Sequence, residues 1–146
     1  MTDVFLFDAV RTPRGKARLD GGLADLSPQE LVRTQIEALK DRGGSAIERA
    51  EALLLGCVTQ SGAQGANIAL ISKLHSGLDD SVAALTINNY CASGLSAIGQ
   101  AIAMVGSGQA NAVLAGGVEM MSQTPFMSDK ASYYSDESLP PRARYI

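Results

Sequence analysis

Short apolar runs alternate with stretches of helical periodicity along the first 126 residues of the chain. The apolar runs have strand length and predict strands over residues 4–10, 52–58, 83–88 and 111–118. The helical pattern between them predicts helices that begin at residues 28, 67 and 91. This alternation predicts an α/β fold with a mostly parallel sheet, right-handed crossovers and helices on both faces.

The first predicted helix has the clearest boundaries. Ser27, Pro28 and Glu30 form a capping box with proline at the first helical position, in which serine and glutamate each satisfy a backbone N–H. Gly43 and Gly44 supply a left-handed stop. Apolar residues form one stripe along this helix, so we expect its other side to face water.

The segment 81–126 is almost free of charge, because Glu119 is its only charged residue. The helix predicted over 91–105 is small or apolar all round, so we expect protein to cover it on every side. It is too short and too polar to span a bilayer. A second sheet is needed on its far side, and we expect a partner chain or further sequence to supply it. The helix would then be buried between layers.

The composition changes after residue 127 to Ser, Asp, Lys, Tyr and a proline pair, with no period of 2 or 3.6. We therefore expect two parts. Residues 1–126 form an incomplete α/β half-domain, and residues 127–146 begin a poorly ordered loop region.

Composition and charge narrow the classes of function. Of the 146 residues, 46% are hydrophobic and 18% are charged, which is the balance of a globular chain. A net charge of −3 gives no electrostatic reason to bind nucleic acid or anionic membranes, so we expect neither as a partner. Two cysteines are too few for a disulfide framework, and Asp3 and Asp8 stand where a signal peptide needs basic residues. Both observations favour the reducing cytoplasm.

Cys91 is the candidate nucleophile, because it lies between a predicted strand and the first position of a predicted helix. The positive end of a helix and its unpaired N–H groups favour a thiolate. The alternative is a buried cysteine that acts as a small hydrophobic residue, and this is the only role we assign to Cys57. His75 falls in the middle of a helical pattern, where we expect a surface residue. The sequence therefore offers no complete Cys-His pair and no metal-ligand spacing.

Four segments, in order, resemble motifs of the thiolase family. Residues 88–97 read NNYCASGLSA and are similar to the nucleophile segment N-x-x-C-x-S-G-x-x-A. Residues 115–122 read AGGVEMMS and resemble the segment A-G-G-x-E-S-M-S. Residues 8–13 and 67–69 resemble the family's opening strand and a further N-x-A segment. The chain departs from these patterns in two places: Met120 replaces the usual serine, and Leu70 stands where an arginine commonly follows N-x-A.

The resemblance implies acyl transfer between coenzyme A thioesters. The cysteine that matches Cys91 attacks the keto carbonyl of a 3-ketoacyl-CoA, releases acetyl-CoA and passes the acyl group to free CoA; the reverse is a Claisen condensation. Coenzyme A and acyl-CoA are then substrates, with no permanently bound cofactor, in an acyltransferase of fatty acid metabolism. The family also implies a homodimer or homotetramer.

The family's remaining catalytic groups lie in a C-terminal half that this chain lacks: a histidine in an N-E-A segment, a G-H-P histidine and a C-x-G cysteine. We therefore expect this chain alone to be inactive. One alternative is a ketoacyl synthase of the same superfamily, which the Gly-Gly-x-Glu segment at residues 116–119 disfavours. A second is a non-catalytic, thiolase-like lipid carrier, which the intact Cys91 motif disfavours.

Overall fold

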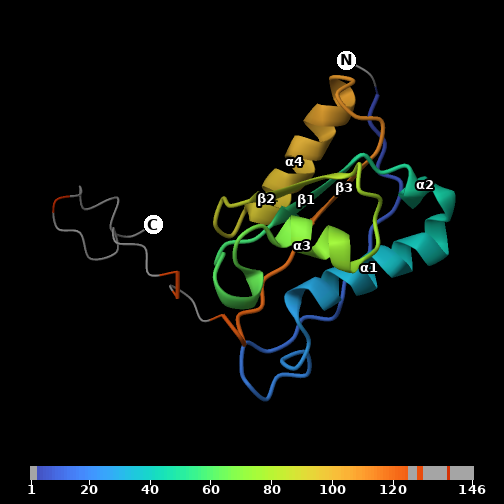
Figure 1. Cartoon of the computed structure of the whole chain (residues 1–146). Coiled ribbons are helices and arrows are strands. Elements are labelled where there is room, and N and C mark those ends of the chain that lie inside the picture. The colour runs from blue at the N-terminus through green and yellow to red at the C-terminus, as the bar shows by residue number, and fades with distance from the viewer. Residues whose placement is uncertain (1–2, 125–127, 130–137, 139–146) are drawn as a thin grey trace.

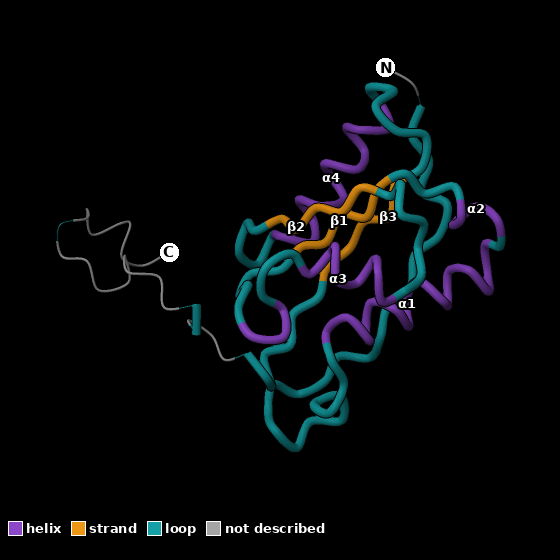
Figure 2. The backbone as a smooth tube through the Cα atoms, in the orientation of Figure 1, coloured by secondary structure: helices purple, strands orange, loops and turns teal. Residues whose placement is uncertain are grey.

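The structure is a computed structural model that describes residues 3–124, 128, 129 and 138. The expectation of a loop region over 127–146 falls almost entirely outside the described residues. Three strands form one parallel sheet, namely β1 (Ala52–Gly56), β2 (Ala83–Ile87) and β3 (Val113–Gly117). Their order is β2-β1-β3 (Figure 2). Leu54 lies opposite both Leu85 and Ala115. The parallel α/β prediction is confirmed.

Helices cover both faces of this sheet, as predicted (Figure 1). The helices α1 (Pro28–Gly43) and α3 (Ile68–His75) lie on one face, and α4 (Ser93–Gly106) lies on the other. A short helix α2 (Ser45–Glu48) follows α1, and the 3-10 turn η1 (Gly62–Gln64) lies between β1 and α3. No helix among the described residues combines the length and apolar composition needed to cross a membrane.

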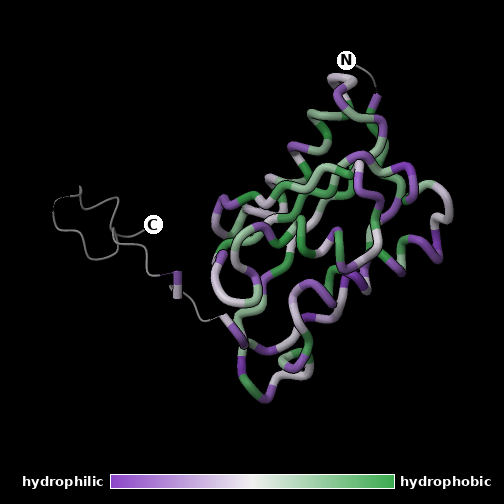
Figure 3. The backbone as a smooth tube through the Cα atoms, viewed as in Figure 1, coloured by the Kyte–Doolittle hydropathy of each residue, from purple (hydrophilic) through white to green (hydrophobic). Residues whose placement is uncertain are grey.

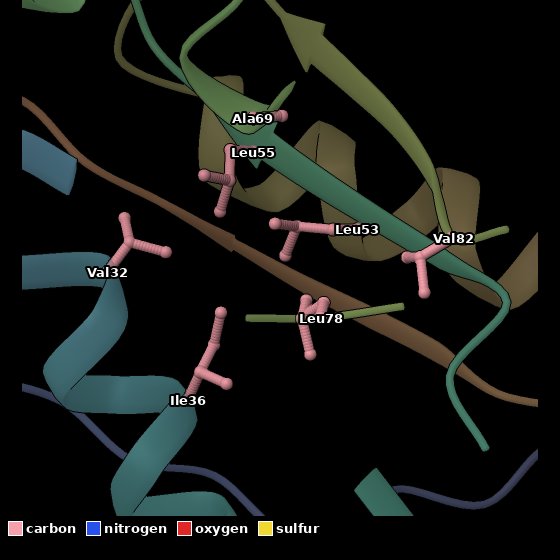
Figure 4. Packing of buried hydrophobic residues seen from close by; sticks show 7 residues of the cluster. All are labelled: Val32, Ile36, Leu53, Leu55, Ala69, Leu78 and Val82. Carbon is pink, nitrogen blue, oxygen red and sulfur yellow. The ribbon is translucent and has the colours of Figure 1, made fainter. Parts of the chain in front are cut away.

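The central strand β1 is buried along its whole length and contributes to two cores. Leu53 and Leu55 point towards α1 and α3, where they pack in a cluster whose other members are Val32, Ile36, Ala69, Leu78 and Val82 (Figure 4). Ala52 and Leu54 point the other way and pack with α4. The alternation follows from the two-residue period of a strand, and it fixes the sheet between two helical layers.

The boundaries predicted for α1 are confirmed. The Ser27 hydroxyl accepts a hydrogen bond from the Glu30 amide at 3.2 Å. Gly44 follows the helix with a φ of 54° and donates its N–H to the Lys40 carbonyl at 2.8 Å. The reciprocal half of the capping box is replaced, because the Glu30 carboxylate pairs with Arg33 and with His75.

The strand predicted over residues 4–10 is wrong. This segment runs as a loop, and Phe5, Leu6 and Phe7 are between 73% and 85% exposed. Its apolar pattern suits a strand, but a strand also needs a hydrogen-bonded neighbour. Among the described residues the sheet consists of β2, β1 and β3, and residues 4–10 pair with neither of its outer strands.

The helix α4 is covered on one face only, which differs from the expected burial on every side. Leu95, Ile98 and Ile102 are 73%, 43% and 52% exposed, whereas Ala97 and Met104 meet the sheet. Figure 3 shows hydrophobic colour along the strands and much of this helix. The sequence pattern describes the side chains of α4, but the layer that would cover them does not lie within the described part of the chain.

Candidate active site

The candidate site lies at the carboxyl edge of the sheet, where the segments that follow the three parallel strands come together. Ligands of open parallel sheets commonly bind at this edge. Backbone hydrogen bonds tie the strand ends: the Cys57 amide donates to the Ile87 carbonyl, and the Val118 amide donates to the Gly56 carbonyl, both at 3.0 Å. The edge is therefore a joined surface formed by residues far apart in the sequence.

Residues 88–92 connect β2 to α4 in a tight loop, which we call the 88–92 loop. The Tyr90 amide donates to the Asn88 side-chain oxygen at 3.0 Å, and Tyr90 itself has a φ of 49°. The Ser93 hydroxyl accepts from the Asn89 amide at 2.9 Å and donates to the Tyr90 carbonyl at 2.6 Å. Asn and Ser side chains stabilise such turns because they replace backbone partners.

Cys91 lies in this loop and is exposed. The prediction that Cys91 is the first helical residue is wrong by two positions, because α4 begins at Ser93 and Ala92 is its N-cap. The amides of Ala92 and Ser93 donate to the carbonyls of Asn89 and Tyr90, which delays the start of the helix. Ala92 provides no side-chain cap. The N–H groups in the first turn of α4, next to the cysteine, therefore have no capping side chain. This is an environment that favours an anion.

The start of α4 is held close to the sheet at two glycines. A Cβ on Gly56 would collide with the backbone of Ser93 and Gly94. A Cβ on Gly117 would lie 3.0 Å from the Gly56 carbonyl oxygen and 3.4 Å from the Cα of Gly94. Because the obstructing atoms are backbone, they cannot rotate away. The ends of β1 and β3 therefore determine where α4, and with it the 88–92 loop, begins.

Cys57, the second cysteine, has a different environment. It is 1% exposed, which confirms the buried role predicted for it. Burial, and to a lesser extent the neighbouring Glu119 carboxylate, raises the pKa of the Cys57 thiol to about 12. A thiol with this pKa is protonated near neutral pH and is a poor nucleophile.

Glu119 is the functional candidate that sequence reasoning did not identify. Its carboxylate accepts hydrogen bonds from the amides of Val58 at 2.7 Å and Thr59 at 3.2 Å, and from the Gln64 side chain at 2.7 Å. One signal was present in the sequence, since Glu119 is the lone charge in an otherwise uncharged stretch. A charge in such surroundings needs hydrogen-bond donors.

His75 lies on α3 and is exposed, which confirms the predicted surface position. Its Nε2 lies 2.9 Å from a carboxylate oxygen of Glu30 on α1. The described residues contain no group of three or more His, Cys, Asp or Glu side chains that could hold a metal ion.

The two departures from the family motifs have different environments. Leu70 is 40% exposed in the first turn of α3, where its amide donates to the Asn67 side chain at 3.1 Å. Met120 is buried, and its amide donates to the Gln64 side-chain oxygen at 2.9 Å. The departure at Leu70 therefore alters a partly exposed surface of α3. The departure at Met120 lies in the buried packing beneath the candidate site.

Comparison with known proteins identifies the family. The chain matches the family model described as "Thiolase, N-terminal domain" over residues 4–140. It is 40% identical over 130 residues to the beta-ketoadipyl-CoA thiolase of Pseudomonas knackmussii, which covers 88% of this chain and 32% of that protein. It is 35% identical over 127 residues to the 3-ketoacyl-CoA thiolase of Bacillus subtilis, which covers 87% of this chain and 32% of that protein.

A solved structure agrees with these relatives. The crystal structure of the Bacillus anthracis acetyl-CoA acetyltransferase matches with a TM-score of 0.66 at 34% identity, over 72% of this chain and 26% of that chain. The chain therefore belongs to the thiolase family. It spans about a third of the length of the curated relatives that it matches.

Proposed function

We propose that Cys91 is the nucleophile of a thiolase that transfers acyl groups between coenzyme A thioesters. The observation that carries this proposal is the contrast between the two cysteines. Cys91 is exposed beside the start of α4 at the carboxyl edge of a parallel sheet, whereas Cys57 is buried and its pKa is raised to about 12. Of the two thiols, Cys91 alone is accessible to a substrate.

The proposed reaction has two acyl-transfer steps. In the first, the Cys91 sulfur attacks the keto carbonyl of a 3-ketoacyl-CoA; the carbon–carbon bond breaks, and acetyl-CoA leaves after its carbanion takes up a proton. In the second, the sulfur of free CoA attacks the acyl-cysteine thioester and the Cys91 thiolate leaves. Covalent catalysis by a thiolate divides one difficult cleavage into two easier transfers. The proton donor and acceptor come from the rest of the protein, as the family resemblance implies.

Two relatives support a 3-ketoacyl-CoA as the substrate class, since one is a beta-ketoadipyl-CoA thiolase and the other a 3-ketoacyl-CoA thiolase. We propose CoA thioesters as diffusing substrates and a cytoplasmic location in fatty acid metabolism. The apolar face of α4 is exposed at Leu95, Ile98 and Ile102. This exposed face supports a dimer or tetramer in which the helix becomes covered on assembly.

Acetyl labelling tests the proposal. The whole protein that carries this segment is incubated with acetyl-CoA, digested and mapped by mass spectrometry, alongside the variants Cys91→Ser and Cys57→Ser. We expect one acetyl group on Cys91, retained in Cys57→Ser and lost in Cys91→Ser together with turnover. Label on Cys57, or on no cysteine while the enzyme turns over, would refute the proposal. An intact protein that binds acyl-CoA without turnover would indicate the lipid carrier instead.

A further inference from the structure

The Glu119 carboxylate anchors the segment that follows β1. One oxygen accepts from the Val58 amide, and the other accepts from the Thr59 amide and the Gln64 side chain. Hydrogen bonds to an ionised acceptor are shorter and stronger than those between neutral groups. These bonds join the carboxyl end of β3 to the carboxyl end of β1, across about 60 positions of sequence.

The side chain of Gln64 donates the third hydrogen bond that Glu119 accepts. Its side chain is fully buried, and its amide nitrogen donates to both the Thr59 carbonyl at 2.8 Å and the Glu119 carboxylate. Its oxygen accepts from the Met120 amide. Both polar atoms of the Gln64 side chain are therefore engaged between the segments that follow β1 and β3, which gives Glu119 one defined position.

A second set of bonds continues from this anchor to the nucleophile. The Val58 carbonyl accepts from the Asn88 side-chain nitrogen at 3.0 Å. The oxygen of the same Asn88 side chain accepts from the Tyr90 amide, one residue before Cys91. Val58 is thus held by Glu119 through its N–H, and it holds the 88–92 loop through its carbonyl.

We propose that Glu119 is a positioning residue for Cys91, acting through Val58 and Asn88 to hold the 88–92 loop in the conformation that presents the thiol. The inference rests on the proposed role of Cys91. Tyr90 is held at a φ of 49°, a region that residues other than glycine seldom occupy, so the loop needs external bonds to stay in this conformation. Loss of the Glu119 carboxylate removes the hydrogen bond that holds the Val58 amide, and the Val58 carbonyl is what supports the 88–92 loop.

The chain contains a matched control for a purely structural role. Glu51 precedes β1, and its carboxylate accepts from the amide and the side-chain nitrogen of Asn111 at 3.2 Å and 2.8 Å. Glu51 therefore joins the amino ends of β1 and β3 as Glu119 joins their carboxyl ends. A variant at Glu51 disturbs the same pair of strands at the edge remote from Cys91.

The experiment compares Glu119→Gln, Glu51→Gln and Asn88→Asp in the whole protein. Asn88→Asp removes the donor to Val58 and keeps the oxygen that accepts from Tyr90. Each protein is measured for its melting temperature, for kcat and KM, and for the rate constants of Cys91 alkylation by iodoacetamide and acetylation by acetyl-CoA. We expect Glu119→Gln and Asn88→Asp to slow both reactions of Cys91 about tenfold and to lower kcat more than KM changes, because small displacements of a reacting group carry large rate penalties. Glu51→Gln lowers the melting temperature and leaves Cys91 at the wild-type rates.

Combining Glu119→Gln with Asn88→Asp tests the route between them. If both act on Cys91 through Val58, the double variant is little slower than either single variant, since residues in one network are not additive. Equal Cys91 rates in Glu119→Gln and Glu51→Gln would overturn the inference, and so would wild-type rates in Asn88→Asp, which decides the question if Glu119→Gln fails to fold. Acetylation absent from wild-type Cys91 would refute the proposed function, whereas alkylation still tests the positioning.

Discussion

Replacing Gly56 by alanine tests whether the sheet sets the position of α4. The added Cβ meets the backbone of Ser93 and Gly94, which belongs to the first turn of the helix. Overpacking of this kind costs about 1–3 kcal/mol, because the obstructing atoms cannot change rotamer. For a domain of this size, each kcal/mol corresponds to about 2–4 °C in melting temperature. We therefore expect Gly56→Ala to melt roughly 2–12 °C below the wild type and to alkylate Cys91 at an altered rate.

Gly116→Ala is the matched control. Gly116 lies in β3 opposite Leu55, one position before the residue paired with Gly56, and a Cβ there meets nothing within 4 Å. At such a position alanine is neutral or stabilises by about 0.4–1 kcal/mol, since it restricts the unfolded chain. Urea denaturation followed by circular dichroism compares the three proteins. If Gly56→Ala and Gly116→Ala unfold at the same urea concentration, the close approach of β1 to α4 does not constrain the helix.

Three further predictions concern the core, the surface charges and the activity of the segment. Leu54→Ala lowers the free energy of unfolding by about 2–5 kcal/mol, whereas Leu95→Ala on the exposed face of α4 changes that of the isolated chain little, as urea titration of the 146-residue chain would show. Hydrogen bonds from Arg33, and then from His75, lower the pKa of Glu30 from 4.5 to about 2, so the stability that this carboxylate contributes is present above pH 4.5 and is lost as the pH falls towards 2. Glu30→Gln should therefore flatten the pH dependence of the melting temperature in that window, and an unchanged profile would contradict the assignment. The 146-residue chain, assayed with acetoacetyl-CoA and CoA, should show no turnover, and turnover that is lost in Cys91→Ala would contradict this expectation. In sedimentation the same chain should form dimers or larger species.

Features that depend on local sequence were predictable. The capping serine before α1, the glycine after it and the alternation of β1 act over a few residues, so their patterns are visible without the fold. The parallel sheet also followed from the sequence, because strands that alternate with helices are joined by crossovers.

The errors have two kinds of cause, a partner distant in the sequence and a local turn closed by a side chain. Residues 4–10 have the pattern of a strand, but a pattern does not identify the neighbour that a strand requires. The start of α4 was misplaced by two residues because the Ser93 side chain closes a turn with Asn89 and Tyr90. Helix propensities are assigned to single residues, so they do not predict a turn that a side chain closes.

Part of the role of Glu119 could have been predicted from the sequence alone. A lone carboxylate in an uncharged stretch must meet donors, because burying an unpaired charge costs several kcal/mol. The carboxyl ends of parallel strands lie on one edge, so the amides that follow a neighbouring strand are among the nearest donors available to a carboxylate that follows β3. What the sequence could not provide is the strand order, which makes β1 the neighbour of both β2 and β3. That order brings Val58 between Glu119 and Asn88, and it is the physical reason why a residue after β3 can govern a cysteine after β2.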